Sequence, residues 1–258
     1  MCKLKSAIIL KDRIFMPDYD SHSKMLEELK ITDDYFNASK VFVRAELSPE
    51  NGDVFSDIDG WKLKVDQDIS PEWFDKKDCT ERMRKAVKEW ANTHIFIGQN
   101  GLKISRGENI FIKDCEDVDI RGKATVKCIN GKATVENICD NATVKYIYDN
   151  ATVESIYGDA TVENICDNAT VKCINGKATV ENIYGDATVE NICDNATVEN
   201  IYGDATVISS RYAKWNNSAS LIISDDATFK DCYSKTIYQA GGWKLVEIKK
   251  GRRYNETY

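Results

Sequence analysis

Apolar and polar residues repeat with a period of nine over the middle of the chain. The tripeptide Ala-Thr-Val begins at residues 124, 133, 142, 151, 160, 169, 178, 187, 196 and 205. In the nine complete units, positions 1, 3 and 6 are apolar, position 4 is Lys or Glu, and positions 8 and 9 are Gly-Lys, Asp-Asn or Gly-Asp. This alternation predicts a strand whose Ala, Val and Ile face inward and whose Thr and charged residue face outward. The closing pair is typical of a corner, because Gly and Asn tolerate positive φ.

Such units are predicted to stack into a parallel β-solenoid, because one strand cannot bury its apolar side alone. Two units, or 18 residues, would form a flattened coil with two parallel sheets. Three units would form a triangular coil. The copy ATVENICDN recurs at 133, 160 and 187, at intervals of 27 residues, whereas ATVENIYGD at 178 and 196 recurs after 18. The two-unit coil is the simpler choice, and the sequence does not decide between the two.

The fold class is therefore mainly β, with an additional α+β domain at the N-terminus. We expect this domain over residues 1–98, the solenoid over 99–213 and a C-terminal capping segment over 214–258. Within the first domain, the patterns predict strands at 7–16, 40–47, 60–69 and 94–98. Helices are predicted at 20–31, capped by Ser21 or Ser23, and at 78–96, capped by Asp78 or Thr80.

Two outward rows of the solenoid are candidates for binding a partner. One row is acidic, and its candidate residues are Glu163, Glu181, Glu190, Glu199, Asp186 and Asp204. The other is the aromatic row at position 7, with Tyr148, Tyr157, Tyr184 and Tyr202. Tyrosine offers a large rigid contact area, which favours an interface. The alternative is that stacked rings only stabilise the solenoid from within.

Charge narrows the choice of partner. The chain carries a net charge of −7, and residues 124–207 contain five lysines against thirteen acidic residues. Five coils would span about 24 Å, giving one net negative charge per about 3 Å, against one per about 1.7 Å in duplex DNA. We therefore expect a protein partner with a basic surface and no direct contact with nucleic acid.

Several other classes of function lack support in the sequence. The only histidines are His22 and His94, no phosphate-binding or nucleophile motif occurs, and two-residue corners leave no loops for an active site. The Gly-Gly-x-Gly-x-Asp motif of calcium-binding nonapeptide repeats is missing, as is any CxxC pair, so no metal or cofactor is predicted. A row of threonines is regular, but the charged row beside it argues against ice binding. We expect no catalytic residue.

The cysteines and the hydropathy bear on location. Nine cysteines occur, and those in the repeats exchange with Asn and Tyr, so free thiols in a reducing compartment are expected rather than disulfides. No segment approaches the ~20 apolar residues of a membrane helix, and the N-terminus does not follow the pattern of a secretion signal. The sequence predicts a cytoplasmic protein without a membrane partner.

The repeats resemble those of nonapeptide-repeat proteins of intestinal bacteria and their phages, a group without an assigned activity. The likeness extends to residues 41–75, VFVRAELSPENGDVFSDIDGWKLKVDQDISPEWFD. A looser likeness is to pentapeptide-repeat DNA mimics, which are acidic β-solenoids that occupy the DNA groove of a target enzyme. Their period is five, with a central Leu or Phe, so only the architecture is shared. Neither resemblance transfers catalytic residues.

These observations favour a non-enzymatic binding protein whose acidic, tyrosine-bearing solenoid engages a macromolecule. In the phage setting that the first resemblance implies, the expected role is inhibition of a host defence or nucleic-acid-handling protein. The alternative is a structural role, in which solenoids associate with each other end to end or side by side.

Overall fold

The computed structural model describes residues 5–213, 219–223, 228–231, 236–239 and 244–248. The chain divides into two compact units, Met1–Ile95 and Phe96–Tyr258. Within the described residues, none of the helices combines the length and the apolar character that a membrane crossing requires.

The N-terminal unit is built on an antiparallel sheet with strand order β2-β1-β3-β4. Its strands are β1 (Lys5–Leu10), β2 (Ile14–Phe15), β3 (Phe42–Ser48) and β4 (Lys62–Val65). The single strand predicted over residues 7–16 is wrong, because the polar residues 11–13 form a turn. Leu10 N donates a hydrogen bond to Arg13 O across that turn, at 2.8 Å.

Three α-helices cover this sheet, α1 (His22–Glu28), α2 (Tyr35–Lys40) and α3 (Lys76–His94), with a short 3₁₀ helix η1 (Ile58–Gly60). Ser21 caps α1 as predicted. The cap of α3 is Asp75, whose side chain accepts from the backbone N–H of Asp78. The predicted caps Asp78 and Thr80 are therefore wrong. Helix α2 was not predicted, because six residues are too few to show a helical period.

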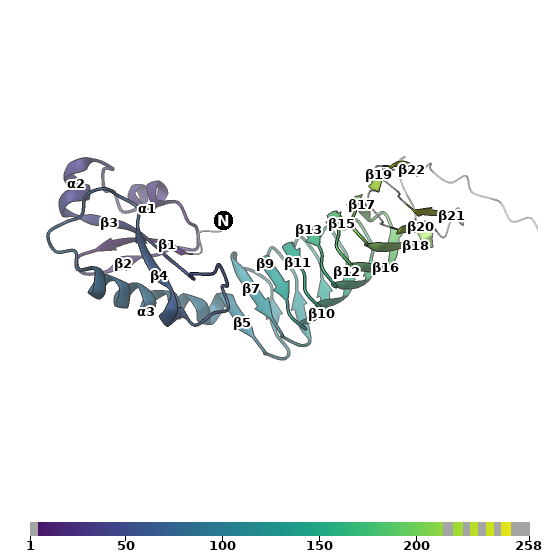
Figure 1. Cartoon of the computed structure of the whole chain (residues 1–258), viewed down its shortest axis with the longest axis horizontal. Helices are drawn as coiled ribbons and strands as arrows, with labels where there is room; N and C mark the ends of the chain where they lie inside the picture. The colour runs from purple at the N-terminus through teal and green to yellow at the C-terminus, as the bar shows by residue number, and fades with distance from the viewer. Residues whose placement is uncertain (1–4, 214–218, 224–227, 232–235, 240–243, 249–258) are drawn as a thin grey trace, which may run out of the picture. The chain divides into compact units, whose positions relative to one another are not determined.

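The helices lie on both faces of the sheet (Figure 1). Met25 and Leu26 of α1 pack with Ile8 and Phe42 of the sheet in one apolar cluster. Helix α3 lies along the opposite face and buries an apolar stripe that includes Met83, Val87 and Trp90. On the α1 face of the sheet, the polar residues Ser6 and Glu46 are buried.

The second unit is a parallel β-solenoid with two sheets of nine strands each. Along the repeats, each strand pairs in parallel with the strand two units away, as in Thr143 with Thr161 and Thr152 with Thr170. Each coil therefore contains two nine-residue units. The two-unit prediction is confirmed, and the triangular three-unit coil is wrong.

Successive strands alternate between the two sheets (Figure 1). The first sheet contains β5 (Ile95–Ile97), β7 (Ile110–Lys113), β9 (Thr125–Asn130), β11 (Thr143–Ile147), β13 (Thr161–Ile165), β15 (Thr179–Ile183), β17 (Thr197–Ile201), β19 (Ala219–Ile223) and β22 (Lys244–Ile248). The second contains β6 (Lys103–Ile104), β8 (Val118–Ile120), β10 (Thr134–Ile138), β12 (Thr152–Ile156), β14 (Thr170–Ile174), β16 (Thr188–Asp194), β18 (Thr206–Ala213), β20 (Thr228–Asp231) and β21 (Thr236–Gln239). Ile95–Ile97, assigned from the sequence to the first domain, thus forms an edge strand of the solenoid.

The interior of the solenoid is formed by the Ala, Val and Ile of every repeat. Each of these side chains is at most 3% exposed. At the corners, position 8 takes a positive φ, as in Gly158 at 74° and Asp149 at 58°. In the Asp-Asn corners it is therefore Asp, and not the Asn suggested by the turn pair, that adopts the left-handed conformation.

The last described strands change direction. β19 pairs with β22 and β20 pairs with β21 in antiparallel fashion, so each parallel stack ends in an antiparallel edge strand. This arrangement lies in the segment predicted to cap the solenoid. Trp215 and Trp243, considered from the sequence as plugs for the last coil, lie outside the described residues.

Candidate functional site

Beside the partly exposed Thr of position 2, the outward surface of each sheet is formed by positions 4 and 5 of the repeat. Positions 3 and 6 are buried, whereas 4 and 5 are both at least partly exposed, so the backbone departs from simple alternation between them. The register of the first sheet pairs positions 2, 3, 5 and 6 and passes over position 4. Each strand of the repeats therefore presents two adjacent outward side chains.

The position-5 residues of three neighbouring coils form an asparagine ladder, Asn164, Asn182 and Asn200. Asn200 Nδ2 donates to Asn182 Oδ1 at 3.1 Å, and Asn182 Nδ2 donates to Asn164 Oδ1 at 3.2 Å. The same amide groups also donate to the main-chain carbonyls of position 4 one coil earlier, at 3.2 to 3.3 Å. The ladder therefore supplies hydrogen bonds to the main-chain carbonyls of position 4, the position that the strand register passes over. It also holds the side chains of this surface in one arrangement.

Beside the asparagine ladder lies a column of glutamates from β13, β15 and β17. Glu163 is paired with Lys145 one coil earlier, with 3.1 Å between Nζ and Oε1. Glu181 and Glu199 are exposed and make no ion pair among the described residues. Neighbouring strands lie about 4.8 Å apart, so these two carboxylates are stacked like charges, which is unfavourable in isolation.

The second sheet arranges the same residue types differently. Lys172 Nζ lies 2.6 Å from Glu154 Oε1. This hydrogen bond, together with the charges of Glu154 and Glu190, raises the pKa of Lys172. Lys172 thus stands between two acids in its column and offsets part of their charge. The structure separates Glu190 from the other candidate glutamates, which all lie on the first sheet.

The candidate tyrosines are divided in the same way. Tyr184 and Tyr202, which follow β15 and β17, stack with ring centroids 5.0 Å apart and planes within 2° of parallel. Tyr148 follows β11 of the same sheet, and its hydroxyl accepts a hydrogen bond from Asn130 Nδ2 at 2.9 Å. Tyr157 follows β12 and belongs to the other sheet. The rings of Tyr184 and Tyr202 therefore stabilise the solenoid while keeping part of their surface exposed.

The environment of these tyrosines favours their neutral form. Burial raises the pKa of Tyr148, Tyr184 and Tyr202. For Tyr157, a hydrogen bond with Cys139 is the main cause of a raised pKa. Burial likewise raises the pKa of the Cys166 thiol, which lies beside Tyr184. These groups are suited to packing and contact and not to nucleophilic chemistry near neutral pH.

The corner acids fall into two groups. At position 8, the Asp140 carboxylate accepts from Gly122 N at 3.0 Å, and the Asp149 carboxylate accepts from Gly131 N at 3.2 Å. These aspartates therefore bind the backbone of the coil before. Asp186 and Asp204, at position 9 after β15 and β17, are exposed. We call the residues gathered on β13, β15, β17 and their following corners the acidic patch: Glu163, Glu181, Glu199, Asp186, Asp204, Tyr184 and Tyr202.

Two features of this surface were not selected from the sequence. The asparagine ladder was not predicted, because Asn occupies position 5 in units of both sheets. Only the 18-residue coil shows which of these asparagines are neighbours. Tyr146, at position 5 of β11, is 43% exposed, more than the 37% of Tyr157. Its neighbours in the column are Cys128 and Asn164, so no regular row marks it.

The described residues also include cysteine thiols and one cluster of possible metal ligands. The seven cysteines in them are free, as expected from their exchange with Asn and Tyr. Within the same residues, one group of three His, Cys, Asp or Glu side chains lies close enough to share a metal ion. It consists of His22, Glu46 and Asp66 and belongs to the N-terminal unit, not to the solenoid corners.

Comparisons of the chain with protein-family models, with curated proteins and with solved structures find no match.

Proposed function

We propose that this protein is a non-enzymatic binding protein that holds a basic macromolecular partner on the acidic patch. The observation that carries the proposal is the stack of Glu181 and Glu199, two exposed carboxylates on neighbouring strands that make no ion pair with any of the described residues. In an isolated solenoid this stack reduces stability. A lysine or arginine from a partner would reverse that effect.

The second sheet shows that the fold itself does not require such a stack. There, Lys172 interrupts the column between Glu154 and Glu190. The same backbone therefore accommodates a lysine between two glutamates, whereas Glu181 and Glu199 are stacked without one beside the asparagine ladder and the stacked tyrosines. This coincidence of charge, fixed amides and aromatic area is typical of an interface.

The side chains of the acidic patch are also preorganised in the free protein. The asparagine ladder and the Tyr184–Tyr202 stack hold side chains of three coils in one arrangement. Side chains that are already ordered lose little conformational entropy on association, which increases affinity. A partner with a rigid basic groove gains most from such a surface.

A nucleic-acid-binding groove fits this description, and the looser resemblance to pentapeptide-repeat DNA mimics points in that direction. Charges on successive coils are about 4.8 Å apart, which is wider than the axial spacing of about 3.4 Å between phosphates along one DNA strand but of the same order. We therefore propose that the partner is a host defence or nucleic-acid-handling protein, whose basic groove the patch occupies in competition with nucleic acid.

The test compares two variants with the same loss of charge on opposite sheets. The patch variant carries Glu163→Gln, Glu181→Gln and Glu199→Gln, and the control carries Glu136→Gln, Glu154→Gln and Glu190→Gln. Each is immobilised as the full chain and exposed to bacterial proteins that bind heparin, and captured proteins are eluted with duplex DNA. We expect the patch variant to lose about tenfold or more of the DNA-elutable capture, and the control to keep it.

Equal capture by both variants would show that the patch is not the binding surface. Sedimentation of the free protein across a dilution series addresses the alternative structural role. A binding protein keeps one small size over the series, whereas self-association predicts species that grow with concentration.

A further inference from the structure

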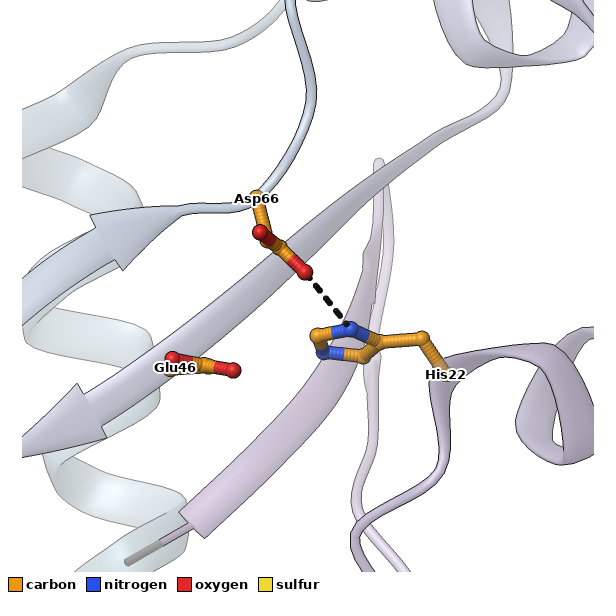
Figure 2. Close-up of side chains that lie close together, drawn as sticks. All are labelled: His22, Glu46 and Asp66. Atoms are coloured by element: carbon orange, nitrogen blue, oxygen red, sulfur yellow. Dashed lines mark ion pairs between the residues drawn. The ribbon is translucent and has the colours of Figure 1, made fainter. Parts of the chain in front are cut away.

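Three potential metal ligands converge in the N-terminal unit, far from one another in sequence. His22 is the first residue of α1, Glu46 lies on β3, and Asp66 follows the last residue of β4. Figure 2 shows the three side chains pointing toward a common point on the α1 side of the sheet. One ligand atom from each lies within 4.8 Å of those from the other two.

The hydrogen bonds of His22 define which of its nitrogens is available. Nε2 lies 3.2 Å from the main-chain oxygen of Ala45, which can only accept a hydrogen bond, so Nε2 carries a proton. In a neutral imidazole, Nδ1 then has a lone pair. Nδ1 lies 3.5 Å from Asp66 Oδ2. In this neutral form two electron-rich atoms face each other beside the Glu46 carboxylate, an arrangement that a bound cation or a second proton on the imidazole would stabilise.

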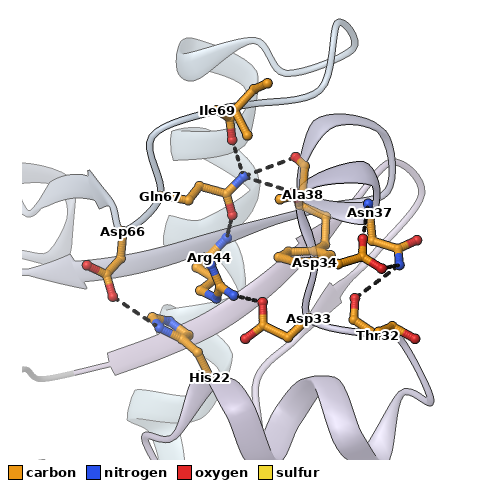
Figure 3. A network of polar contacts seen from close by, with 11 residues as sticks. His22, Thr32, Asp33, Asp34, Asn37, Ala38, Arg44, Asp66, Gln67 and Ile69 are labelled. Carbon is orange, nitrogen blue, oxygen red and sulfur yellow. Dashed lines mark hydrogen bonds and ion pairs between the residues drawn. The ribbon is translucent and has the colours of Figure 1, made fainter.

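This arrangement matches that of a metal-binding histidine. Such a histidine usually donates its second ring N–H to a backbone carbonyl or a carboxylate, which fixes its tautomer and its orientation. Ala45 supplies that carbonyl here. Arg44, the arginine of β3, does not supply the positive charge at His22 and Asp66, because its guanidinium pairs with Asp33 (Figure 3).

The loop that carries Asp66 is held firmly in place. The side chain of Gln67 accepts from Arg44 N at 2.8 Å and donates to Ile69 O at 2.6 Å and to Phe42 O at 3.2 Å. Asp66 N itself donates to Arg44 O at 2.9 Å. Figure 3 shows how these contacts tie the loop to β3 beside His22. The backbone position of Asp66 is therefore set by its surroundings.

The cluster has a buried inner wall and one side that reaches solvent. Glu46 is 5% exposed, and the side chains of His22 and Asp66 are 10% and 42% exposed. Ser6, paired with Glu46 across the neighbouring strand, has a buried hydroxyl without a hydrogen-bond partner among the described residues. Asp66 also lines a surface pocket of about 640 Å³ together with Arg44 and Gln67. An ion can therefore reach the cluster at Asp66, its exposed member.

We propose that His22, Glu46 and Asp66 bind a divalent transition-metal ion, with Zn²⁺ or Mn²⁺ as suitable occupants of one nitrogen and two carboxylate ligands. Around one such ion, ligand atoms about 2.1 Å from the metal lie about 3.4 Å apart. The cluster must contract to reach this geometry, and the exposed side chain of Asp66 has the freedom to rotate inward. Three protein ligands leave a coordination position for water or for a ligand that enters from the pocket.

The first experiment uses Mn²⁺, because this ion prefers nitrogen and oxygen ligands and avoids the free cysteines of the chain. The full chain is freed of metal with a chelator and titrated with Mn²⁺ while the electron paramagnetic resonance of free Mn²⁺ is recorded. We expect one bound ion per chain, displaced by about one equivalent of Zn²⁺.

The decisive variant is Asp66→Asn, which changes an exposed ligand and preserves its shape. We expect it to weaken Mn²⁺ binding by about tenfold or more. Loss of a residue that only hydrogen-bonds to a metal ligand already has an effect of this size. Asp68→Asn, an exposed carboxylate in the same pocket but outside the cluster, is the matched control and should bind as the unmodified chain does. Thermal unfolding without metal verifies that both variants fold.

A second measurement uses the nitrogen resonances of His22. Bound Zn²⁺ should shift Nδ1 while Nε2 keeps its proton. Two results would overturn the proposal: equal Mn²⁺ affinity in Asp66→Asn and the unmodified chain, or a proton on Nδ1 that persists when Zn²⁺ is added. The second result would mean that a charged imidazole, and not a metal ion, supplies the positive charge between His22 and Asp66.

Discussion

At the scale of single residues, the tyrosines at position 7 lie against the neighbouring coil and ionise reluctantly. Tyr184 stacks on Tyr202 and contacts Cys166, and burial is the main cause that raises the pKa of both phenols. A phenol in the unfolded chain ionises near its ordinary pKa of about 10. The folded state therefore retains the proton at a pH where the unfolded state has lost it.

The sign of the resulting pH dependence follows from this difference. Because the folded pKa is the higher one, the stabilisation is fully present below pH 10 or so and is lost as the pH rises through the folded pKa. We predict that the free energy of unfolding in urea falls between pH 9 and pH 11 or thereabouts. In the variant Tyr184→Phe/Tyr202→Phe this fall should be smaller.

Tyr35→Phe provides the control for that experiment, because Tyr35 is 74% exposed. It should leave the pH dependence of the unmodified chain as it is. If the double variant and the control lost stability equally between the two pH values, ionisation of the stacked pair would not be the cause.

At the scale of strands and rows, the asparagine ladder distinguishes the two sheets. Asn182 donates to Glu163 O and to Asn164 Oδ1 and accepts from Asn200. A net hydrogen bond within a protein contributes about 1 kcal/mol. We therefore predict that Asn182→Ala lowers the free energy of unfolding by about 2 kcal/mol, measured by urea denaturation.

Asn191→Ala is the matched control for this row. Asn191 occupies position 5 on the second sheet, is exposed, and its side chain makes no hydrogen bond among the described residues. Its substitution should change stability by less than about 0.5 kcal/mol. Similar losses in the two variants would mean that intrinsic strand preference, and not the ladder, determines the effect.

The period of nine was sufficient to predict the core but not the rows. Ala, Val and Ile recur in every unit, so their burial follows whichever units stack. The separation of Glu190 from Glu181 depends on the 18-residue coil, and an interval of nine is compatible with both 18 and 27. The corner conformation of Asp149 likewise depends on the stacking of backbones, which no single unit displays.

The cluster in the N-terminal unit was beyond prediction for a different reason. His22, Glu46 and Asp66 come from three elements, and their spacing in sequence matches no metal-binding motif. Each residue also has an ordinary role in its own pattern: a position near a helix cap, an alternating strand residue and a turn residue. Only the antiparallel pairing of β1, β3 and β4 brings them together.

At the scale of the whole molecule, the scaffold and its surface follow different periods. The buried residues repeat every nine residues, whereas the contacts of the outward rows join residues 18 apart, as in Lys145 with Glu163 and Tyr184 with Tyr202. Removing complete nine-residue units, whether odd or even in number, should therefore leave the core in register. Only the removal of an odd number of units moves all later strands to the opposite sheet.

Two deletions in the full chain test this separation. Deleting residues 133–150 removes one coil and leaves Glu181 above Glu199 on the same sheet. Deleting residues 187–195 removes one unit, so that Glu199 and Tyr202 move to the sheet of Lys172, away from Glu181 and Tyr184. We expect both products to keep the β-type circular dichroism of the parent, because Ala, Val and Ile still stack on the same residue type in the neighbouring coil.

Mild photo-oxidation followed by mass spectrometry reports the rows directly, since phenol rings in contact can couple to dityrosine. The Tyr184–Tyr202 crosslink should form in the parent, where the ring centroids are 5.0 Å apart, and in the 18-residue deletion, but not in the nine-residue one. DNA-elutable partner capture should follow the crosslink, because both depend on the same two coils. A nine-residue deletion that retained capture without the crosslink would show that the partner reads the total charge of the solenoid and not the arrangement of the acidic patch.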